Sequence, residues 1–301
     1  MAPSLIIICG PTASGKTKVS LALAKLFGGE VISADSQQVY RGMDIGTAKP
    51  TPEEQILVRH HLIDVATPDE QFHVGRYLQL ADQAIADIDK RGRKVVVVGG
   101  TGLYITSLLY GLCEAPPRDE AVRQCFEDVA AHDGLDELYR RLMAVDPKTA
   151  ATTHPHQRRR LIRALEVYEL TGKPFSSFFD VEKRVRRHDS KIIGLLCDRK
   201  VLCQRIDTRV DQMLKHGWLE EVEGLVKRYG PQCPAFMAHG YRELVDYVQG
   251  KSTITDAAHI IKRNVRHYAK RQMTWFRGLD GIQWFAHDDV ESMIAYVEQN
   301  I

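Results

Sequence analysis

The stretch Gly10-Pro-Thr-Ala-Ser-Gly-Lys-Thr17 lies between an apolar run, residues 5–9, and a helical pattern that continues through Leu26. It matches the phosphate-loop pattern G-x-x-x-x-G-K-[ST] in the required context, after a strand and before a helix. Its glycines let backbone N–H groups point inward, Lys16 adds a mobile cation, and Thr17 offers a hydroxyl to Mg²⁺. The stretch predicts a polyphosphate site; a glycine-rich turn without a ligand is the alternative.

Further apolar runs follow the first, and each is followed by polar or glycine-rich residues and then a helical pattern. This order is typical of a parallel sheet covered by helices on both faces. The fold class is therefore α/β, with a P-loop NTPase-like parallel sheet. The predicted strands are residues 5–9, 31–34, 95–98 and 192–197, with 282–285 as an additional strand before a last helix at 290–299.

The stretch 116–174 interrupts this alternation and contains no strand-like run. It indicates helices at 120–131, 135–145 and 157–170. We therefore expect an all-helical insertion domain at 116–174, inside a catalytic core formed by 1–115 and 175–301. Residues 199–277 of that core are mostly helical, with breaks at glycines.

The composition indicates an ordinary soluble protein: 301 residues, 44% hydrophobic, 27% charged, with a net charge of +2. Its six cysteines form no C-x-x-C pair, which is typical of reduced thiols in the cytoplasm. No apolar stretch is long enough to span a membrane, and the chain begins directly with the first strand. We expect a cytoplasmic protein without an obligate protein partner, with a monomer as the default.

The acidic residue expected beside a phosphate loop follows a different strand in this chain than in an NTPase. An NTPase usually carries an Asp at the end of a second apolar strand, but residues 95–98 run into Gly99-Gly100-Thr101. Asp35 instead follows the strand at 31–34, where it can hold Mg²⁺ through water or accept a proton from a nucleophile. Ser36, Gln37 and Gln38 come next, and glutamine amides suit a purine edge. The alternatives are a helix cap at Asp35 and a cap or turn at Thr101.

Several motifs, in order along almost the whole chain, resemble the bacterial tRNA dimethylallyltransferase family. Besides the phosphate loop they are Asp35-Ser-Gln-Gln-Val-Tyr40, Gly46-Thr-Ala-Lys-Pro50, His60-His-Leu-Ile-Asp64, Val98-Gly-Gly-Thr-Gly-Leu-Tyr104, Asp198-Arg199 with Arg205 and Arg209, Gly240-Tyr-Arg-Glu243, and Tyr268-Ala-Lys-Arg-Gln272 with Trp275-Phe-Arg277. His239 departs from the pattern, because a small apolar residue is expected before Gly240.

The resemblance implies transfer of a dimethylallyl group from dimethylallyl diphosphate to N6 of adenosine 37, next to the tRNA anticodon. The phosphate loop would then hold a diphosphate leaving group with Mg²⁺ on Thr17, and Asp35 would be the general base. Catalytic roles are implied for Asp35, Thr101 and Lys16. The diphosphate-binding residues would be Gly10, Pro11, Thr12, Ala13, Ser14, Gly15, Lys16, Thr17, Arg205 and Arg209. For the two arginines, a solvated helix face is the alternative.

Two basic segments suit the anticodon stem-loop. One is residues 157–163; the other, 262–277, contains no acid and places Lys262, Arg266 and Lys270 at helical spacing. A third basic cluster lies at 183–188, but no particular residue in it indicates a contact with RNA. Solvated faces are the alternative for all three. With the resemblance, the residues expected to contact tRNA are Asp35, Ser36, Gln37, Gln38, Thr101, Arg123, Arg159, Arg160, Leu161, Ile162, Arg163, Lys270 and Arg271.

Three other functions use the same loop. A nucleotide or small-molecule kinase predicts ATP turnover and has no need of two arginine-rich helices. A nucleotide-sensing RNA-binding factor leaves Asp35 without a catalytic role. An adenylate dimethylallyltransferase would act on free nucleotide, and the basic helical insertion favours tRNA over it.

Overall fold

The computed structural model describes residues 4–179 and 185–299. The chain forms two compact units: one combines Met1–Gly111 with Arg186–Ile301, and the other is Leu112–Val185. The second unit is therefore wider at both ends than the insertion range 116–174. Residues 183 and 184 of the third basic cluster lie outside the described residues.

The first unit contains one sheet of six parallel strands in the order β3-β2-β4-β1-β5-β6. The strands are β1 (Leu5–Cys9), β2 (Glu30–Ser33), β3 (His60–His61), β4 (Val95–Gly99), β5 (Ser190–Leu196) and β6 (Ile282–Ala286). Five of them lie where the apolar runs predict strands. The short β3 has no apolar run, and it forms by pairing with Val31 and Ile32 at the sheet edge.

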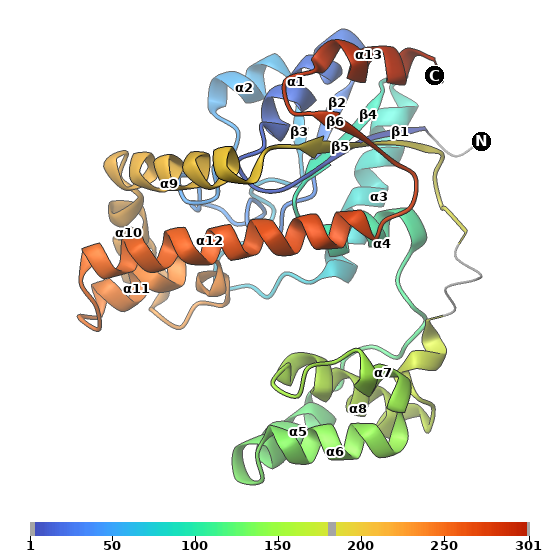
Figure 1. The fold of residues 1–301 in the computed structure, drawn as a ribbon, viewed down its shortest axis with the longest axis vertical. Coiled ribbons are helices and arrows are strands. Elements are labelled where there is room, and N and C mark those ends of the chain that lie inside the picture. Colours follow the sequence, from blue (N-terminus) through green and yellow to red (C-terminus); the bar gives the residue numbers. More distant parts are fainter. Residues whose placement is uncertain (1–3, 180–184, 300–301) are drawn as a thin grey trace. The chain divides into compact units, whose positions relative to one another are not determined.

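Alternation along β1 divides the core of this unit into two faces. Leu5, Ile7 and Cys9 pack with α3 (Val74–Lys90) and α4 (Gly102–Tyr110). Ile6 and Ile8 pack on the other face with α1 (Lys16–Leu26) and α13 (Val290–Glu298). Successive side chains of a strand point to opposite faces, so both faces need an apolar helix. Figure 1 shows these helices on the two sides of the sheet, with α2 (Pro52–Leu57) beside α1.

The segment after β5 adds a helical layer with its own core. It consists of α9 (Arg199–Lys215), α10 (Trp218–Tyr229), the 3-10 turn η3 (Pro234–Met237), α11 (Tyr241–Val248) and α12 (Ile254–Arg277). Gly217, Gly230 and Gly250 have positive φ angles of 96°, 79° and 73° and separate these helices, as their positions in the sequence predict. Trp218 and Tyr241 are fully buried at the centre of this layer.

The regular elements among the described residues of the second unit are all helices. Its elements are α5 (Glu120–His132), α6 (Leu135–Val145), α7 (Pro147–Ala151), α8 (Arg158–Thr171) and η1 (Phe175–Phe178). Leu138, Leu142, Leu161 and Ile162 form its core. The short α7, capped by Asp146 and begun by Pro147, has too few apolar residues to be recognised by periodicity. Among the described residues, no helix of the chain has the length and apolar character that crossing a membrane requires.

Candidate active site

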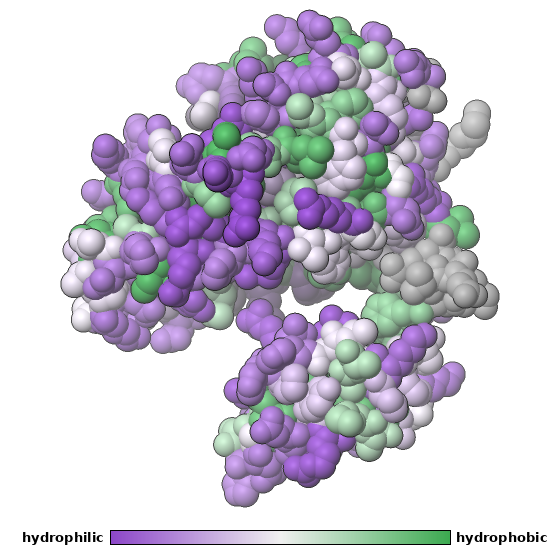
Figure 2. Space-filling model, viewed as in Figure 1, coloured by the Kyte–Doolittle hydropathy of each residue, from purple (hydrophilic) through white to green (hydrophobic). Residues whose placement is uncertain are grey.

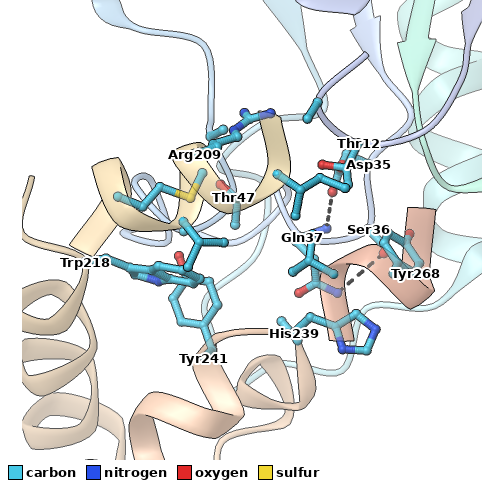
Figure 3. A pocket seen from close by; sticks show the side chains of 18 of the residues that line it. Thr12, Asp35, Ser36, Gln37, Thr47, Arg209, Trp218, His239, Tyr241 and Tyr268 are labelled. Atoms are coloured by element: carbon cyan, nitrogen blue, oxygen red, sulfur yellow. Dashed lines mark hydrogen bonds between the residues drawn. The ribbon is translucent and has the colours of Figure 1, made fainter. Parts of the chain in front are cut away.

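Three loops meet where neighbouring parallel strands end. They are residues 10–17 after β1, 35–38 after β2 and 99–104 after β4. In parallel sheets, ligand sites form outside the carboxyl ends of the strands. A cavity of about 220 Å³ lies here, and residues of the helical layer complete its wall. Figure 3 shows Thr12, Asp35 and Gln37 on one side of it, and Trp218 and Tyr241 on another.

The phosphate loop has the backbone that an anion cradle requires. Gly15 and the non-glycine Ala13 have φ angles of 89° and 63°, in the left-handed region. The Lys16 ammonium folds back over the loop and donates to the Pro11 carbonyl at 2.7 Å. The Ser14 hydroxyl is buried and forms no hydrogen bond to any described residue. The loop is therefore formed before a ligand binds.

Two cations face this loop without a neutralising partner. Among the described residues, neither Lys16 nor Arg209 forms an ion pair with a carboxylate, and Arg209 of α9 lines the cavity. Burial lowers the pKa of Lys16 to about 8, against the attraction of Asp35 and with the repulsion of Arg209. Burial likewise lowers the pKa of Arg209. An anion of several charges is the ligand that would relieve this repulsion.

We expect diphosphate binding to weaken as the pH rises through about 8, because the free protein then loses the Lys16 proton. The affinity is full below that pH, and binding above it takes up one proton. Calorimetry in buffers of different ionisation enthalpy measures both effects. Lys16→Met distinguishes the titration of Lys16 from that of the diphosphate itself. If the affinity of the variant depends on pH as that of the original protein does, Lys16 is not the group that titrates.

Asp35 has one carboxylate oxygen engaged in backbone capping. Oδ1 accepts the N–H of Gln37 at 2.8 Å and that of Gln38 at 3.4 Å, so it caps the turn that follows β2; no helix begins here, because the next one is α2 at Pro52. The other oxygen, Oδ2, accepts no hydrogen bond from the described residues. Asp35 also lines the cavity. The capping therefore fixes the carboxylate and leaves Oδ2 to accept a proton.

The two glutamines differ in availability. The Gln38 amide is occupied: its Oε1 accepts from Ser33 at 2.9 Å and its Nε2 donates to the Thr47 and Ala48 carbonyls. Gln37 lines the cavity, and its Oε1 is buried without a partner among the described residues. The Gln38 amide is therefore not free for the expected purine contact and holds the 47–48 loop in place, while the contact from Gln37 stays a prediction.

Gln272 of α12 connects two of the site loops; it ends the motif Tyr268-Ala-Lys-Arg-Gln272, but the sequence predicted no role for it. Its Oε1 accepts the Thr12 N–H at 2.8 Å and its Nε2 donates to the Gly100 carbonyl at 2.9 Å. A Cβ at Gly100 would lie 2.2 Å from that Nε2, so a larger residue there would displace the Gln272 amide. Thr101 completes the arrangement, since its hydroxyl accepts the Ser36 N–H at 3.0 Å. The helix thus holds the phosphate loop and the Asp35 loop in register.

Gln272→Leu should lower kcat/KM by about ten- to a hundredfold, because it frees both loops while preserving side-chain size. Thermal unfolding measured in parallel separates a positioning effect from loss of the fold. Thr274→Ala on the same helix is the control, since among the described residues the Thr274 hydroxyl bonds only to the Lys270 carbonyl. Equal kcat/KM in Gln272→Leu and Thr274→Ala would contradict a positioning role.

The remaining wall of the cavity is apolar. Its side chains come from the helical layer: Ile206, Val210 and Met213 of α9, Val265 of α12, and the aromatic pair Trp218 and Tyr241. Gly46 and Gly240 pack so closely on Trp218 that a Cβ on either would lie about 2 Å from the indole. The cavity therefore joins a cationic, phosphate-binding end to an apolar end. Sequence reasoning missed this wall, because its members lie far apart in the chain.

The predicted cationic groups of the first unit are only partly free. Lys262 and Arg266 form ion pairs with Asp211 and Asp207 of α9, at 2.6 and 2.5 Å. The three-residue stripe expected along 262–270 is therefore reduced to Lys270, which is exposed. Arg271 is also exposed, and its Nη2 lies 3.1 Å from Nε2 of His239 at the cavity rim. Figure 2 shows the hydrophilic surface over α9 and α12.

The side chains of Arg205 and Arg209 have different surroundings, although the two residues lie one helical turn apart. Arg209 faces the phosphate loop, whereas the exposed Arg205 lies 2.7 Å from Nε2 of His287. Arg205 does not line the cavity. Its expected diphosphate contact stays a prediction.

The arginines of the second unit fall into two groups. Arg123 and Arg163 bind the fully buried Glu166 at 3.2 and 2.9 Å, which ties α5 to α8. Arg159 and Arg160 are exposed at the start of α8. Leu161 and Ile162 face the core, so their side chains cannot touch RNA, contrary to the expectation for these two positions. The exposed pair is the better candidate for phosphate contacts.

The residues present suit a Mg²⁺ ion held mainly by a ligand. Thr17 is half-buried in the first turn of α1, and its hydroxyl forms no hydrogen bond within the described chain. The described residues contain no group of three or more His, Cys, Asp or Glu that could hold a metal ion. Mg²⁺ is commonly bound through few protein ligands plus phosphate oxygens, so this arrangement fits.

A phosphate loop on a parallel sheet, a fixed carboxylate and an apolar cavity define a P-loop-fold enzyme that binds a phosphorylated apolar molecule. Residues 38–279 match the family model described as IPP transferase. The chain belongs to the tRNA dimethylallyltransferase family, which confirms the resemblance.

Curated relatives and solved structures of this family are similar to the chain over nearly its whole length. A tRNA dimethylallyltransferase of Geobacillus kaustophilus is 47% identical and covers 99% of this chain and 95% of its own. A tRNA isopentenylpyrophosphate transferase from Bacillus halodurans has a TM-score of 0.73 at 43% identity, covering 98% and 95% of the two chains. A eukaryotic dimethylallyltransferase acting on tRNA has a TM-score of 0.83 at 30% identity, covering 99% of this chain and 77% of its own.

Proposed function

We propose that this protein transfers the dimethylallyl group of dimethylallyl diphosphate to N6 of adenosine 37 in tRNA. One observation carries the proposal: a single cavity joins Arg209, the fixed carboxylate Asp35 and an apolar wall, and it is bordered by Thr12 and Ala13 of the phosphate loop that holds Lys16. Dimethylallyl diphosphate matches this cavity, because its diphosphate suits the cationic end and its five carbons suit the apolar end. The membership of the chain in this family supports the same reaction.

In this reaction the N6 lone pair forms a bond to C1 of the dimethylallyl group as the bond from C1 to the diphosphate oxygen breaks. The proton leaves N6 for Oδ2 of Asp35. The carboxylate need not be strongly basic, because N6 becomes acidic only as the new bond forms. Lys16, Arg209 and the loop amides stabilise the charge gathering on the departing diphosphate. Thr17 would hold Mg²⁺, which supplies further positive charge against the diphosphate when bound.

The purine must leave the stacked anticodon loop before it reaches Asp35. Gln37 lines the cavity, and its amide oxygen, which is buried without a partner among the described residues, would accept a hydrogen bond from the base once the side chain turns toward it. Thr101 holds the adjoining backbone at Ser36. We assign Lys270 and Arg271 of α12, together with Arg159 and Arg160 of α8, to the RNA phosphates. The protein acts as a monomer in the cytosol, where its six free thiols would stay reduced.

The assay that tests this function uses purified protein, Mg²⁺ and dimethylallyl diphosphate with tRNA, or with AMP in its place. Digestion of the product and mass analysis of its nucleosides should show dimethylallyladenosine from tRNA only. Modified AMP with unmodified tRNA would favour the free-nucleotide reaction. Consumption of ATP without either product would favour a kinase.

Arg159→Ala with Arg160→Ala should weaken tRNA binding and lower the slope of log K against log salt by about 1–2, because each phosphate contact contributes about 0.7–0.9 to that slope. Binding titrations from low to moderate salt measure this slope. Arg141→Ala in the same unit is the matched control, since Arg141 is paired with Glu137 at 2.7 Å. A slope identical in the double variant and the control would reject these contacts.

A further inference from the structure

Trp275 of α12 is exposed although it carries a large apolar ring. Its exposed fraction is 48%, whereas Trp218 is 1% exposed and Trp284 is half-buried. Its neighbours in the helix, Gln272 and Phe276, are buried. The indole is therefore a large apolar group that the fold leaves at the surface of this segment, and the reaction described above gives it no role.

The ring is held in one orientation. Its Nε1–H donates to the Thr106 hydroxyl at 3.0 Å. The indole also lies directly on the backbone of Gly102, where a Cβ would come within 2.3 Å of it. Because the only polar group of the ring is satisfied and its edge is fixed, what remains available is a rigid, flat, apolar surface. Such a surface costs little entropy when a second flat group stacks on it.

This surface lies beside the cavity mouth. Gly102, under the indole, follows Thr101, whose hydroxyl holds the Asp35 loop. Arg271, which reaches the cavity rim, precedes Trp275 by one helical turn and so shares its face of α12. Leu103, the residue after Gly102 in the first turn of α4, is apolar and 46% exposed. We call Trp275 and Leu103 the α12–α4 platform.

The charge around the platform favours a nucleic acid over an apolar protein partner. Lys270, Arg271 and Arg277 of the same helix are exposed, and residues 262–277 contain no acid. Bases of single-stranded RNA loops, once unstacked, are typically held on aromatic rings while cations hold their phosphates. An exposed indole among cations at the mouth of the site combines both features.

We propose that the α12–α4 platform stacks a base of the anticodon loop adjacent to the adenosine that enters the cavity. The contact replaces the stacking partner that the neighbouring base loses when the target base is withdrawn. It rests on the proposed function, because it requires that an RNA loop be presented at this cavity. It adds a binding residue, Trp275, to the tRNA contacts that the resemblance implies.

The test compares Trp275→Ala, Trp275→Phe and Lys270→Ala in titrations with an anticodon stem-loop RNA over a range of salt. Trp275→Ala should bind about five- to a hundredfold more weakly, as loss of one stacked base implies. Its salt slope should be unchanged, because no phosphate contact is lost. Trp275→Phe should keep most of the affinity, and Lys270→Ala should lower the slope.

Tryptophan fluorescence gives a second readout on the unmutated protein. Adding the stem-loop should quench the emission, and Trp275→Phe should remove most of that quenching. Undiminished RNA affinity in Trp275→Ala, or equal losses in the Ala and Phe variants, would overturn the platform. Quenching that persists in Trp275→Phe would overturn it as well. The prenylation assay tests the proposed function separately. If the binding experiments reject the platform but the protein still transfers the dimethylallyl group to tRNA, the proposed function stands.

Discussion

Asp35→Asn should lower kcat for prenyl transfer by about a hundred- to ten-thousandfold, the usual contribution of a general base. The asparagine keeps a carbonyl oxygen that can accept the Gln37 and Gln38 N–H groups, so the cap that Oδ1 forms is retained. What the variant loses is the acceptor for the N6 proton. Single-turnover measurement with bound tRNA reports the chemical step directly.

Asp35→Ala provides the comparison, because it removes the cap as well as the base. Both variants should still bind tRNA, and only the alanine variant should also lose thermal stability. If Asp35→Asn turns over at a near-normal rate while Asp35→Ala does not, the carboxylate is a cap and another group takes the proton. Activity that falls equally in the two variants, with the fold intact, supports the base.

Lys16→Met should lower kcat/KM by about a hundred- to a thousandfold, because a preorganised cation at the leaving group is lost. The methionine preserves an unbranched side chain of similar length. The loss should appear with dimethylallyl diphosphate and not in tRNA affinity, since Lys16 faces the phosphate loop. Steady-state kinetics with the donor varied at saturating tRNA measure it.

Lys18→Met is the matched control, because Lys18 lies two residues along α1 and is exposed. It removes the same charge from the same helix without touching the loop. Comparable losses in the two variants would mean that general charge, and not the loop ammonium, assists the reaction.

The sheet could be predicted from the sequence because buried parallel strands are continuous apolar runs. Residues 5–9 and 95–98 are such runs, and they became β1 and β4. The phosphate loop could also be located, since a short contiguous motif specifies it. β3 could not be predicted: its two residues, His60 and His61, are strand only because the edge of β2 pairs with them.

The cavity wall was beyond sequence reasoning for a different reason. Val210, Trp218 and Val265 each look like ordinary core positions, and only the packing of α9 to α12 brings them to one surface. The same packing decided which charges are free. Lys262 and Arg266 have helical spacing suited to RNA, but α9 places aspartates against them. A charge pattern shows where cations lie along a helix and not what lies opposite.

The central claim is that the phosphate loop holds the diphosphate of an isoprenoid donor while Asp35 deprotonates a tRNA adenosine. The most direct measurement incubates the protein with Mg²⁺, dimethylallyl diphosphate, tRNA and ATP, and quantifies diphosphate, ADP and modified nucleoside together. We predict diphosphate and dimethylallyladenosine in equal amounts, with ATP unchanged. ADP formed without any prenylated nucleoside would contradict the account.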